Sequence, residues 1–378
     1  MGETRAPRSR VAVASGTPAG ERGATPDEPR PLPLDTVPAA FRAAVAEFGS
    51  GPALVLGHND ADGLSAALLL AAGLERAGRP AEIRILGRGE TPWSDEIRRE
   101  IDSRQPGALL VTNLGIRAPA IRPGLPTVLV DHHVPRGRPK GATVLTGYGL
   151  EPQPTSSLLA FHAASGIADV DDLVWLAALG LIGDMAEAGG FSELATARAR
   201  YGITALRKAT SLVNQARRSA SGNPAPALAL LRKADGPKAV LSGEHPETAT
   251  LLAARDEVRV ALEAARKTPP KLTGEVALIA FASPCQVHPL VAQTWAGRLR
   301  GRIVLAANTG FRPGWVHFAA RSDGETDLIA FLARHAPEGA EENYGGGHAR
   351  ASGGVLRPAD WNSFVRGLGF GPEAEVAA

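Results

Sequence analysis

The sequence predicts an α/β protein: a doubly wound parallel-sheet domain, then a helical connector and a smaller α/β domain. Two observations lead to this fold class. Short continuous apolar runs, such as Ala53-Leu54-Val55-Leu56 and Val128-Leu129-Val130, alternate with longer helical patterns. Such runs are typical of parallel strands that are covered on both faces. A second alternation of strand and helix patterns begins after Pro269-Pro270.

The first unit follows the order of strands and helices that builds a doubly wound sheet. Each expected strand is a short apolar run, and each expected helix repeats apolar residues at three- and four-residue spacing. The elements, in order, are strand 53–57, helix 63–77, strand 82–86, helix 93–101, strand 108–112, strand 127–131, helix 156–165 and helix 172–186.

Residues 190–268 have a helical pattern throughout, with Arg and Lys residues spread along it. Pro269-Pro270 ends this pattern because proline lacks the backbone donor that a helix needs. The elements expected after it are strand 275–282, helix 289–300, strand 302–308, strand 315–321 and helix 326–335.

Composition limits the classes of protein to consider. The 378 residues carry a net charge of +2, so nucleic-acid binding would have to come from local patches. The single cysteine, Cys285, excludes an intrachain disulfide framework and is expected to be a buried apolar group in a reducing compartment. We expect a cytoplasmic protein without a membrane span, because no apolar run reaches 18 residues. The five tryptophans are dispersed, which predicts no platform of interleaved aromatic and basic residues.

Two short segments place metal-ligand side chains directly after expected strands. They are His58-Asn59-Asp60-Ala61-Asp62-Gly63 and Asp131-His132-His133. Open α/β sheets bind ligands beyond the carboxyl ends of their strands, so we expect these segments to form one site. Carboxylates and imidazoles without thiolates favour Mn²⁺ or Mg²⁺ over structural zinc. The alternative is that Asp60 and Asp62 only cap the following helix.

Five motifs occur in an order that resembles one superfamily: His58-x-Asp60-x-Asp62-Gly63, Asn113-Leu114-Gly115, Asp131-His132-His133, Gly183-Asp184 and Gly345-Gly346-Gly347-His348. The series resembles the DHH phosphoesterases that carry a DHHA1 domain, over roughly residues 40–370. The compact spacing of the first motif is most similar to the RecJ-like single-strand exonucleases. Oligoribonucleases, cyclic dinucleotide phosphodiesterases and inorganic pyrophosphatases belong to the same superfamily.

The resemblance implies a site for two Mn²⁺ ions, with Mg²⁺ as the alternative. The implied metal ligands are His58, Asp60, Asp62, Asn113, His132 and Asp184. The implied catalytic residues are Asp131, His132 and His133, which support the metals or contact the substrate. Two cations about 3.5–4 Å apart can activate a water and stabilise charge on a scissile phosphate.

Asn113 departs from the superfamily pattern, in which this strand normally ends in an aspartate that bridges both metals. An amide oxygen can ligate one cation, but it contributes no charge and bridges poorly. We therefore expect weaker binding of the second metal, a different metal preference or lost activity.

The second domain carries the expected substrate-binding residues. Gly345-Gly346-Gly347-His348 lets backbone amides approach an anion closely, and Arg321-Ser322 follows a strand and resembles the phosphate-binding arginine of DHHA1 domains. The alternatives are a flexible turn for the glycines and a solvated charge for Arg321. His317 has no motif near it, so an ordinary polar role is favoured. His288 stands just before Pro289 at an expected helix start, so a capping role is favoured for it.

These features predict four segments: a disordered tail (1–36), a DHH metal-binding catalytic domain (37–190), a helical connector (191–270) and a DHHA1 substrate-binding domain (271–372). The predicted function is Mn²⁺-dependent hydrolysis of phosphodiester bonds in single-stranded nucleic acid or short oligonucleotides. Alternatives are an oligoribonuclease with 3'-phosphoadenosine-5'-phosphate phosphatase activity, or a nucleic-acid-binding protein whose catalysis Asn113 weakens. The expected partners are the nucleic-acid or nucleotide substrate and no membrane, and a homodimer is compatible with the sequence.

Overall fold

The first sheet has the expected parallel architecture. The computed structural model describes residues 29–340 and 344–377. Residues 1–28 of the predicted tail lie outside the described residues, whereas residues 29–36 are described and include the 3-10 helix Leu34–Thr36. The strands of the first sheet are all parallel, in the order β2-β1-β3-β4-β5. Their bounds are β1 (Ala53–Gly57), β2 (Ala81–Ile85), β3 (Ala108–Thr112), β4 (Thr127–Asp131) and β5 (Ala142–Thr146).

Helices cover both faces of this sheet, which is why its central strands are continuously apolar. On one face α2, α4 and α5 pack together, and α1 packs on α4. On the other face Leu54 and Leu56 pack with Ile97 and Ile101 of α3, while Val55 belongs to the larger core. The helices are α1 (Val37–Ala46), α2 (Ala61–Arg76), α3 (Asp95–Arg104), α4 (Ser156–Ser165) and α5 (Val174–Gly183).

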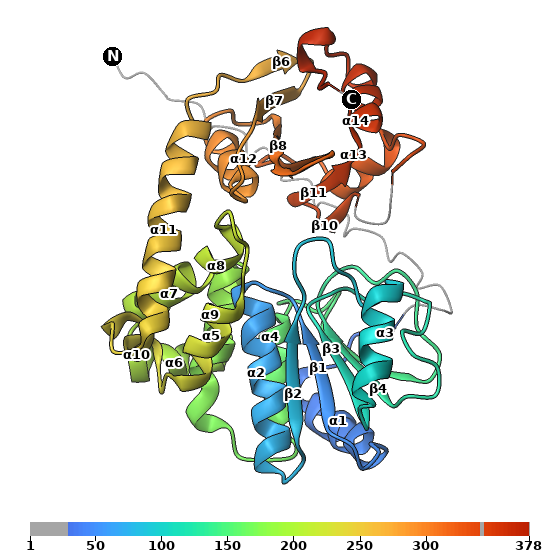
Figure 1. Ribbon diagram of the computed structural model, residues 1–378, viewed down its shortest axis with the longest axis vertical. Coiled ribbons are helices and arrows are strands. Elements are labelled where there is room, and N and C mark those ends of the chain that lie inside the picture. Colours follow the sequence, from blue (N-terminus) through green and yellow to red (C-terminus); the bar gives the residue numbers. More distant parts are fainter. Residues whose placement is uncertain (1–28, 341–343, 378) are drawn as a thin grey trace, which may run out of the picture.

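The connector is helical, as expected, but it consists of several short helices before one long one. The helices are α6 (Ser192–Tyr201), α7 (Ile203–Val213), α8 (Gln215–Arg218), α9 (Ala225–Lys233), α10 (Pro237–Ser242) and α11 (Pro246–Ala265). Figure 1 shows α11 running from the first domain up to the second. Short 3-10 helices occur at Leu34–Thr36, Asp171–Leu173, Ala186–Gly189 and Pro372–Ala374.

The second domain is built on a mixed sheet in the order β10-β11-β9-β8-β7-β6, in which β7 and β8 are parallel and the other pairs are antiparallel. The strands are β6 (Lys271–Thr273), β7 (Val276–Phe281), β8 (Ile303–Arg312), β9 (Trp315–Arg321), β10 (Gly346–His348) and β11 (Ala351–Leu356). The helices are α12 (His288–Ala296), α13 (Leu328–Arg334) and α14 (Pro358–Gly367). Strands β6, β10 and β11 and helix α14 were not among the expected elements.

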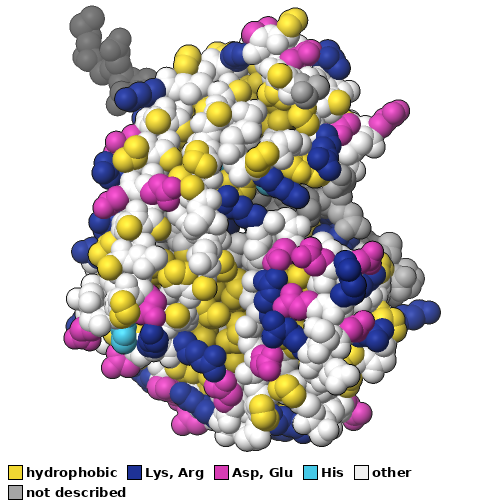
Figure 2. Space-filling view, in the orientation of Figure 1, with side chains coloured by type: hydrophobic (Ala, Val, Ile, Leu, Met, Phe, Trp, Pro, Cys, Tyr) yellow, Lys and Arg dark blue, Asp and Glu magenta, His cyan; other side chains and the backbone are white. Residues whose placement is uncertain are grey.

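The two sheets lie one above the other along the long axis, and β10 and β11 are at the side of the upper sheet nearest the first domain (Figure 1). Figure 2 shows Lys and Arg side chains where the upper and lower parts meet. Among the described residues, no helix combines the length and apolar character needed to cross a membrane.

Candidate metal centre and interdomain cleft

The loop after β1 is held in place by the start of α2. Asp60 is the N-cap of this helix, and its Oδ1 accepts a hydrogen bond from the backbone N–H of Gly63 at 2.8 Å. Its Oδ2 lies 2.9 Å from Nδ1 of His58. A Cβ on Gly63 would lie 2.5 Å from the carbonyl oxygen of His58, so only glycine permits this close approach. The capping role and a metal-binding role for Asp60 are therefore compatible.

Asp62 is buried between α2, α4 and α5. Its two carboxylate oxygens accept hydrogen bonds from the backbone N–H groups of Ser156 and Ser157, at 3.0 and 2.9 Å. Those groups belong to the first turn of α4, where helix N–H groups lack partners within the helix. Burial and the charge of Asp184 raise the pKa of Asp62 to about 6.

The close approach of α5 to Asp62 depends on Gly180. A Cβ at this position would lie 2.2 Å from Oδ1 of Asp62 and 2.0 Å from Oγ of Ser157. Gly180→Ala is expected to lower the free energy of unfolding by about 1–3 kcal/mol, because overpacking displaces the buried carboxylate. Gly183→Ala is the control on the same helix, where the new Cβ would make an ordinary 3.4 Å contact with Ala61. Urea unfolding checks the difference; equal stability of both variants would contradict it.

Asp131 orients the neighbouring imidazole His133. Its Oδ2 accepts a hydrogen bond from the Gly115 N–H at 2.7 Å, and its Oδ1 accepts one from the His133 N–H at 2.8 Å. The same Oδ1 lies 2.9 Å from Nδ1 of His133. Burial raises the pKa of Asp131, but the adjacent His133 outweighs it, so the net pKa lies below its usual range.

His132 joins two carboxylates from different elements. Its Nε2 lies 3.2 Å from Oδ2 of Asp184 and 3.9 Å from Oδ2 of Asp62. One ligand atom from each of these three residues lies within 4.8 Å of the others. Burial lowers the pKa of His132, but the carboxylates outweigh it and raise the pKa to about 9. Two acids around one imidazole nitrogen fit a divalent cation in charge and in donor type.

His348 reaches this cluster from the second domain. Its ring centroid lies 5.6 Å from that of His132 and 5.5 Å from that of His133. The three imidazoles form a second group whose ligand atoms lie within 4.8 Å of one another. Burial and the two neighbouring histidines lower the pKa of His348 to about 4, so this ring is neutral at pH 7.

Asn113 lies beside the cluster, with both ends of its amide engaged. The residue is buried and has a φ of 59°, a region that asparagine tolerates better than most residues. Its Nδ2 donates to Oδ1 of Asp60 at 3.1 Å, and its Oδ1 accepts from Oγ of Ser156 at 3.0 Å. Because the Asp60 carboxylate only accepts hydrogen bonds, the amide nitrogen has to face Asp60.

A cleft of about 560 Å³ opens between the two domains next to these residues. Its lining from the first domain includes His58, Asn113, His133 and Arg136, and that from the second includes Gly345, Gly346 and Gly347. Arg321 and Ser322, expected at the substrate, are not among its described lining residues. Arg321 donates to the carbonyl oxygens of Ala320 and Ser352, and the Ser322 hydroxyl accepts from the Gly324 N–H.

Several residues of this region were not expected from the sequence. From the connector, Oδ1 of Asn214 accepts a hydrogen bond from the Ala61 N–H at 3.1 Å, and Nη1 of Arg217 lies 4.0 Å from Oδ2 of Asp60. His288 and His317, for which the sequence favoured a capping role and an ordinary polar role, line the cleft. The one available signal was the pair Arg217-Arg218, which ends the short helix α8.

A scan against protein-family models found no match for this chain, and a search of curated proteins found none. Solved structures do match. RecJ from Thermus thermophilus in complex with Mn²⁺ gives a TM-score of 0.67 at 20% identity, covering 90% of this chain and 55% of that one. For exonuclease RecJ bound to manganese the TM-score is 0.59 and the identity 21%, and the match covers 89% of this chain and 94% of that one. For the DHH domain of a member of the s1p family of ribosomal proteins the TM-score is 0.63 and the identity 17%, and the match covers 88% of this chain and 90% of that one.

The chain thus spans about half the length of the Thermus RecJ and nearly all of the other two structures. It has the fold of these structures, an α/β domain with a second mixed-sheet domain. The predicted fold class, a doubly wound parallel-sheet domain followed by a second α/β domain, is therefore confirmed.

Proposed function

We propose that this protein is a divalent-metal-dependent phosphoesterase of the DHH superfamily that hydrolyses phosphodiester bonds in single-stranded nucleic acid or short oligonucleotides. The observation that carries the proposal is the grouping of Asp62, His132 and Asp184 at the carboxyl edge of a parallel sheet. His133, whose ring centroid lies 4.5 Å from that of His132, lines a cleft of about 560 Å³ whose far wall holds the glycine-rich segment before His348. The RecJ structures of the same fold are bound to Mn²⁺, which supports a divalent cation here.

Asp62, His132 and Asp184 would hold a divalent cation, and His58 and Asp60 would provide ligands for a second. Mixed carboxylate and imidazole donors favour Mn²⁺ and permit Mg²⁺. A divalent cation bound here would supply Lewis acidity for water activation and for charge on the phosphate. The backbone N–H groups of α4 keep Asp62 oriented, so its carboxylate does not have to reorganise when the cation binds.

The remaining residues would act on the substrate. Asp131 holds His133 toward the cleft, so this ring would contact the phosphate without binding the cation itself. The neutral His348 would donate one N–H from the opposite wall. Gly345, Gly346 and Gly347 have no side chains and would let the phosphate backbone approach closely. Arg321 and Ser322 lie at the end of β9, which is separated from the glycine-rich strand β10 by β11. They would hold the wall of the cleft that contacts the phosphate.

His348→Ala and Arg321→Ala are expected to raise KM by about tenfold or more and to leave bound metal unchanged. For His348 the change removes one hydrogen bond to a charged phosphate, which costs about 1.5–3 kcal/mol. For Arg321 it removes the hydrogen bonds to the Ala320 and Ser352 carbonyls that hold this wall of the cleft. Both residues belong to the second domain. Steady-state kinetics and metal analysis of the purified variants check this division of roles. Reduced metal content with unchanged KM would contradict it.

Hydrolysis of end-labelled short DNA and RNA with and without Mn²⁺ tests the proposed function directly. A parallel reaction on 3'-phosphoadenosine-5'-phosphate tests the small-nucleotide alternative with the same metal site. The binding-protein alternative is favoured by Asn113, whose neutral amide stands where the superfamily pattern has a carboxylate. Tight oligonucleotide binding with no release of nucleotide or phosphate under any metal would support that alternative and exclude the enzyme.

A further inference from the structure

A row of basic and aromatic side chains leads out of the cleft along the first domain. We define the arginine–tryptophan strip as Arg136, Arg117, Trp93 and Arg98. Arg136 and Arg117 line the cleft beside His133 and Asn113. Arg117, Trp93 and Arg98 line an adjoining hollow of about 340 Å³, which shares Thr91 and Arg117 with the cleft. The strip is therefore continuous with the candidate metal centre.

The backbone forces the first two arginines of the strip together. Residues 117 and 136 form an isolated parallel bridge, supported by hydrogen bonds from the Ala118 N–H to the Arg136 carbonyl and from the Arg136 N–H to the Ile116 carbonyl, at 3.0 and 2.8 Å. Side chains at bridged positions point to the same face, and like charges there are unfavourable. Burial and the neighbouring Arg136 lower the pKa of Arg117. Two guanidinium groups on one face of the cleft offer adjacent contacts to a polyanion.

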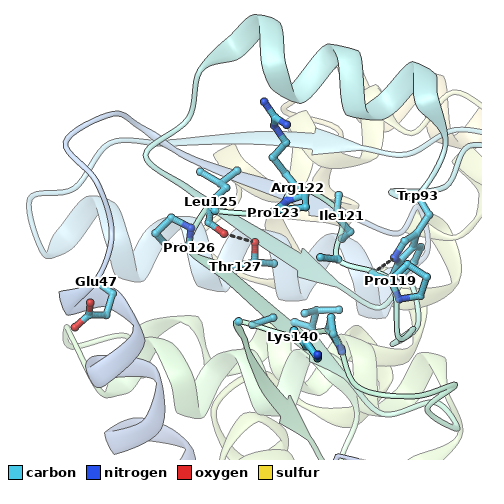
Figure 3. A pocket seen from close by; sticks show the side chains of 16 residues that line it. Glu47, Trp93, Pro119, Ile121, Arg122, Pro123, Leu125, Pro126, Thr127 and Lys140 are labelled. Carbon is cyan, nitrogen blue, oxygen red and sulfur yellow. Dashed lines mark hydrogen bonds between the residues drawn. The ribbon is translucent and has the colours of Figure 1, made fainter. Parts of the chain in front are cut away.

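Trp93 offers a ring next to these charges. The guanidinium of Arg117 lies 4.6 Å from the centroid of the Trp93 ring, and the indole N–H donates to the carbonyl oxygen of Pro119 at 2.8 Å. Figure 3 shows Trp93 beside Pro119 at one end of a further pocket of about 350 Å³. The sequence predicted no platform of interleaved aromatic and basic residues; the structure does place single Arg side chains over the rings of Trp93, Trp295 and Trp315.

The hollow beside Trp93 also contains polar atoms without partners. Oγ1 of Thr91 and Nε of Arg98 are buried and make no hydrogen bond with any residue that the structure describes. The guanidinium of Arg98 does reach the exposed Asp95 at 3.8 Å and the Ala120 carbonyl at 3.5 Å, both of which are long contacts. Donors of this kind, next to an indole ring, match a phosphate and a base of the same nucleotide.

We propose that the arginine–tryptophan strip binds the part of a single-stranded oligonucleotide that extends from the cleft away from the scissile phosphate. Phosphates lie on Arg136, Arg117 and Arg98, and one base stacks on the ring of Trp93. The strip makes the protein prefer oligonucleotides several residues long over dinucleotides. This inference rests on the proposed function for the position of the scissile phosphate.

Binding of oligothymidylates of two and five nucleotides, followed by fluorescence anisotropy in EDTA, tests the strip without hydrolysis. Wild type is expected to bind the five-nucleotide strand about tenfold more tightly than the dinucleotide. Trp93→Ala should remove most of this gain and leave dinucleotide affinity unchanged, whereas Trp93→Phe should retain it because a ring remains. Arg117→Ala should reduce the slope of log affinity against log salt for the longer strand by about 0.7.

Arg99→Ala is the matched control, since Arg99 lies on the same helix as Arg98 but is exposed and hydrogen-bonded to the Asp95 carbonyl; it should not alter the length dependence. Equal wild-type affinity for both lengths, or an equal loss for both lengths in Trp93→Ala, would overturn the proposal. Trp93→Phe and Arg117→Ala keep it testable if Trp93→Ala does not fold. If the protein prefers the longer strand but shows no Mn²⁺-dependent hydrolysis, the proposed function is wrong and the binding role of the arginine–tryptophan strip is retained.

Discussion

Asp184→Ala is expected to reduce divalent-metal-dependent hydrolysis by about a thousandfold or more while the fold remains intact. Asp184 follows the last residue of α5, and its side chain is 25% exposed, so truncation removes little packing. Its carboxylate is one of the two that approach Nε2 of His132. Loss of one metal ligand removes several kcal/mol of transition-state stabilisation, and about 4 kcal/mol corresponds to a thousandfold.

Turnover, bound metal and thermal unfolding should be measured together for this variant. Asp172→Ala is the control, because Asp172 is an exposed acid that pairs with Arg76 far from the cleft. It should retain both metal and activity. If Asp184→Ala is folded and still hydrolyses substrate at the wild-type rate, the proposed centre is wrong.

Asn113→Asp is expected to destabilise the metal-free protein and to make its stability strongly dependent on Mn²⁺. The substitution removes the amide N–H group that donates a hydrogen bond to Asp60. It puts a second carboxylate in its place, about 3 Å from the first. A lost hydrogen bond to a charged group costs about 1.5–3 kcal/mol, and each kcal/mol lowers Tm by about 2–4 °C in a domain of 150–250 residues. A cation placed between two carboxylates removes the repulsion, so Mn²⁺ should raise Tm more in the variant than in wild type.

Asn214→Asp is the matched control for this experiment. Asn214 is also buried beside α2, but its Oδ1 accepts from the Ala61 N–H, and a carboxylate can do the same. Thermal unfolding in EDTA and in Mn²⁺, with calorimetric titration of the ion, separates the two variants. If Asn113→Asp unfolds like wild type in EDTA and binds Mn²⁺ no more tightly, then residue 113 is not at the metals.

Local sequence was sufficient where one strong signal dominated. The bounds of β1, β3 and β4 were predicted to the residue, because buried parallel strands are uninterrupted apolar runs ending in polar loops. Strand β5 was missed because it lies at the edge of the sheet and is only partly apolar. Strands β10 and β11 were missed because their glycines indicate turns, and pairing with β9 decides their conformation.

The same division applies to the site. The sequence by itself determined which segments carry ligand side chains, because polar residues after neighbouring parallel strands share one edge of the sheet. Only the tertiary structure decided that Asn214 and Arg217 of the connector approach the start of α2, and that Asn113 links Asp60 to α4. These contacts join residues more than 40 positions apart. Their geometry depends on how helices pack around the sheet, and no local periodicity encodes that packing.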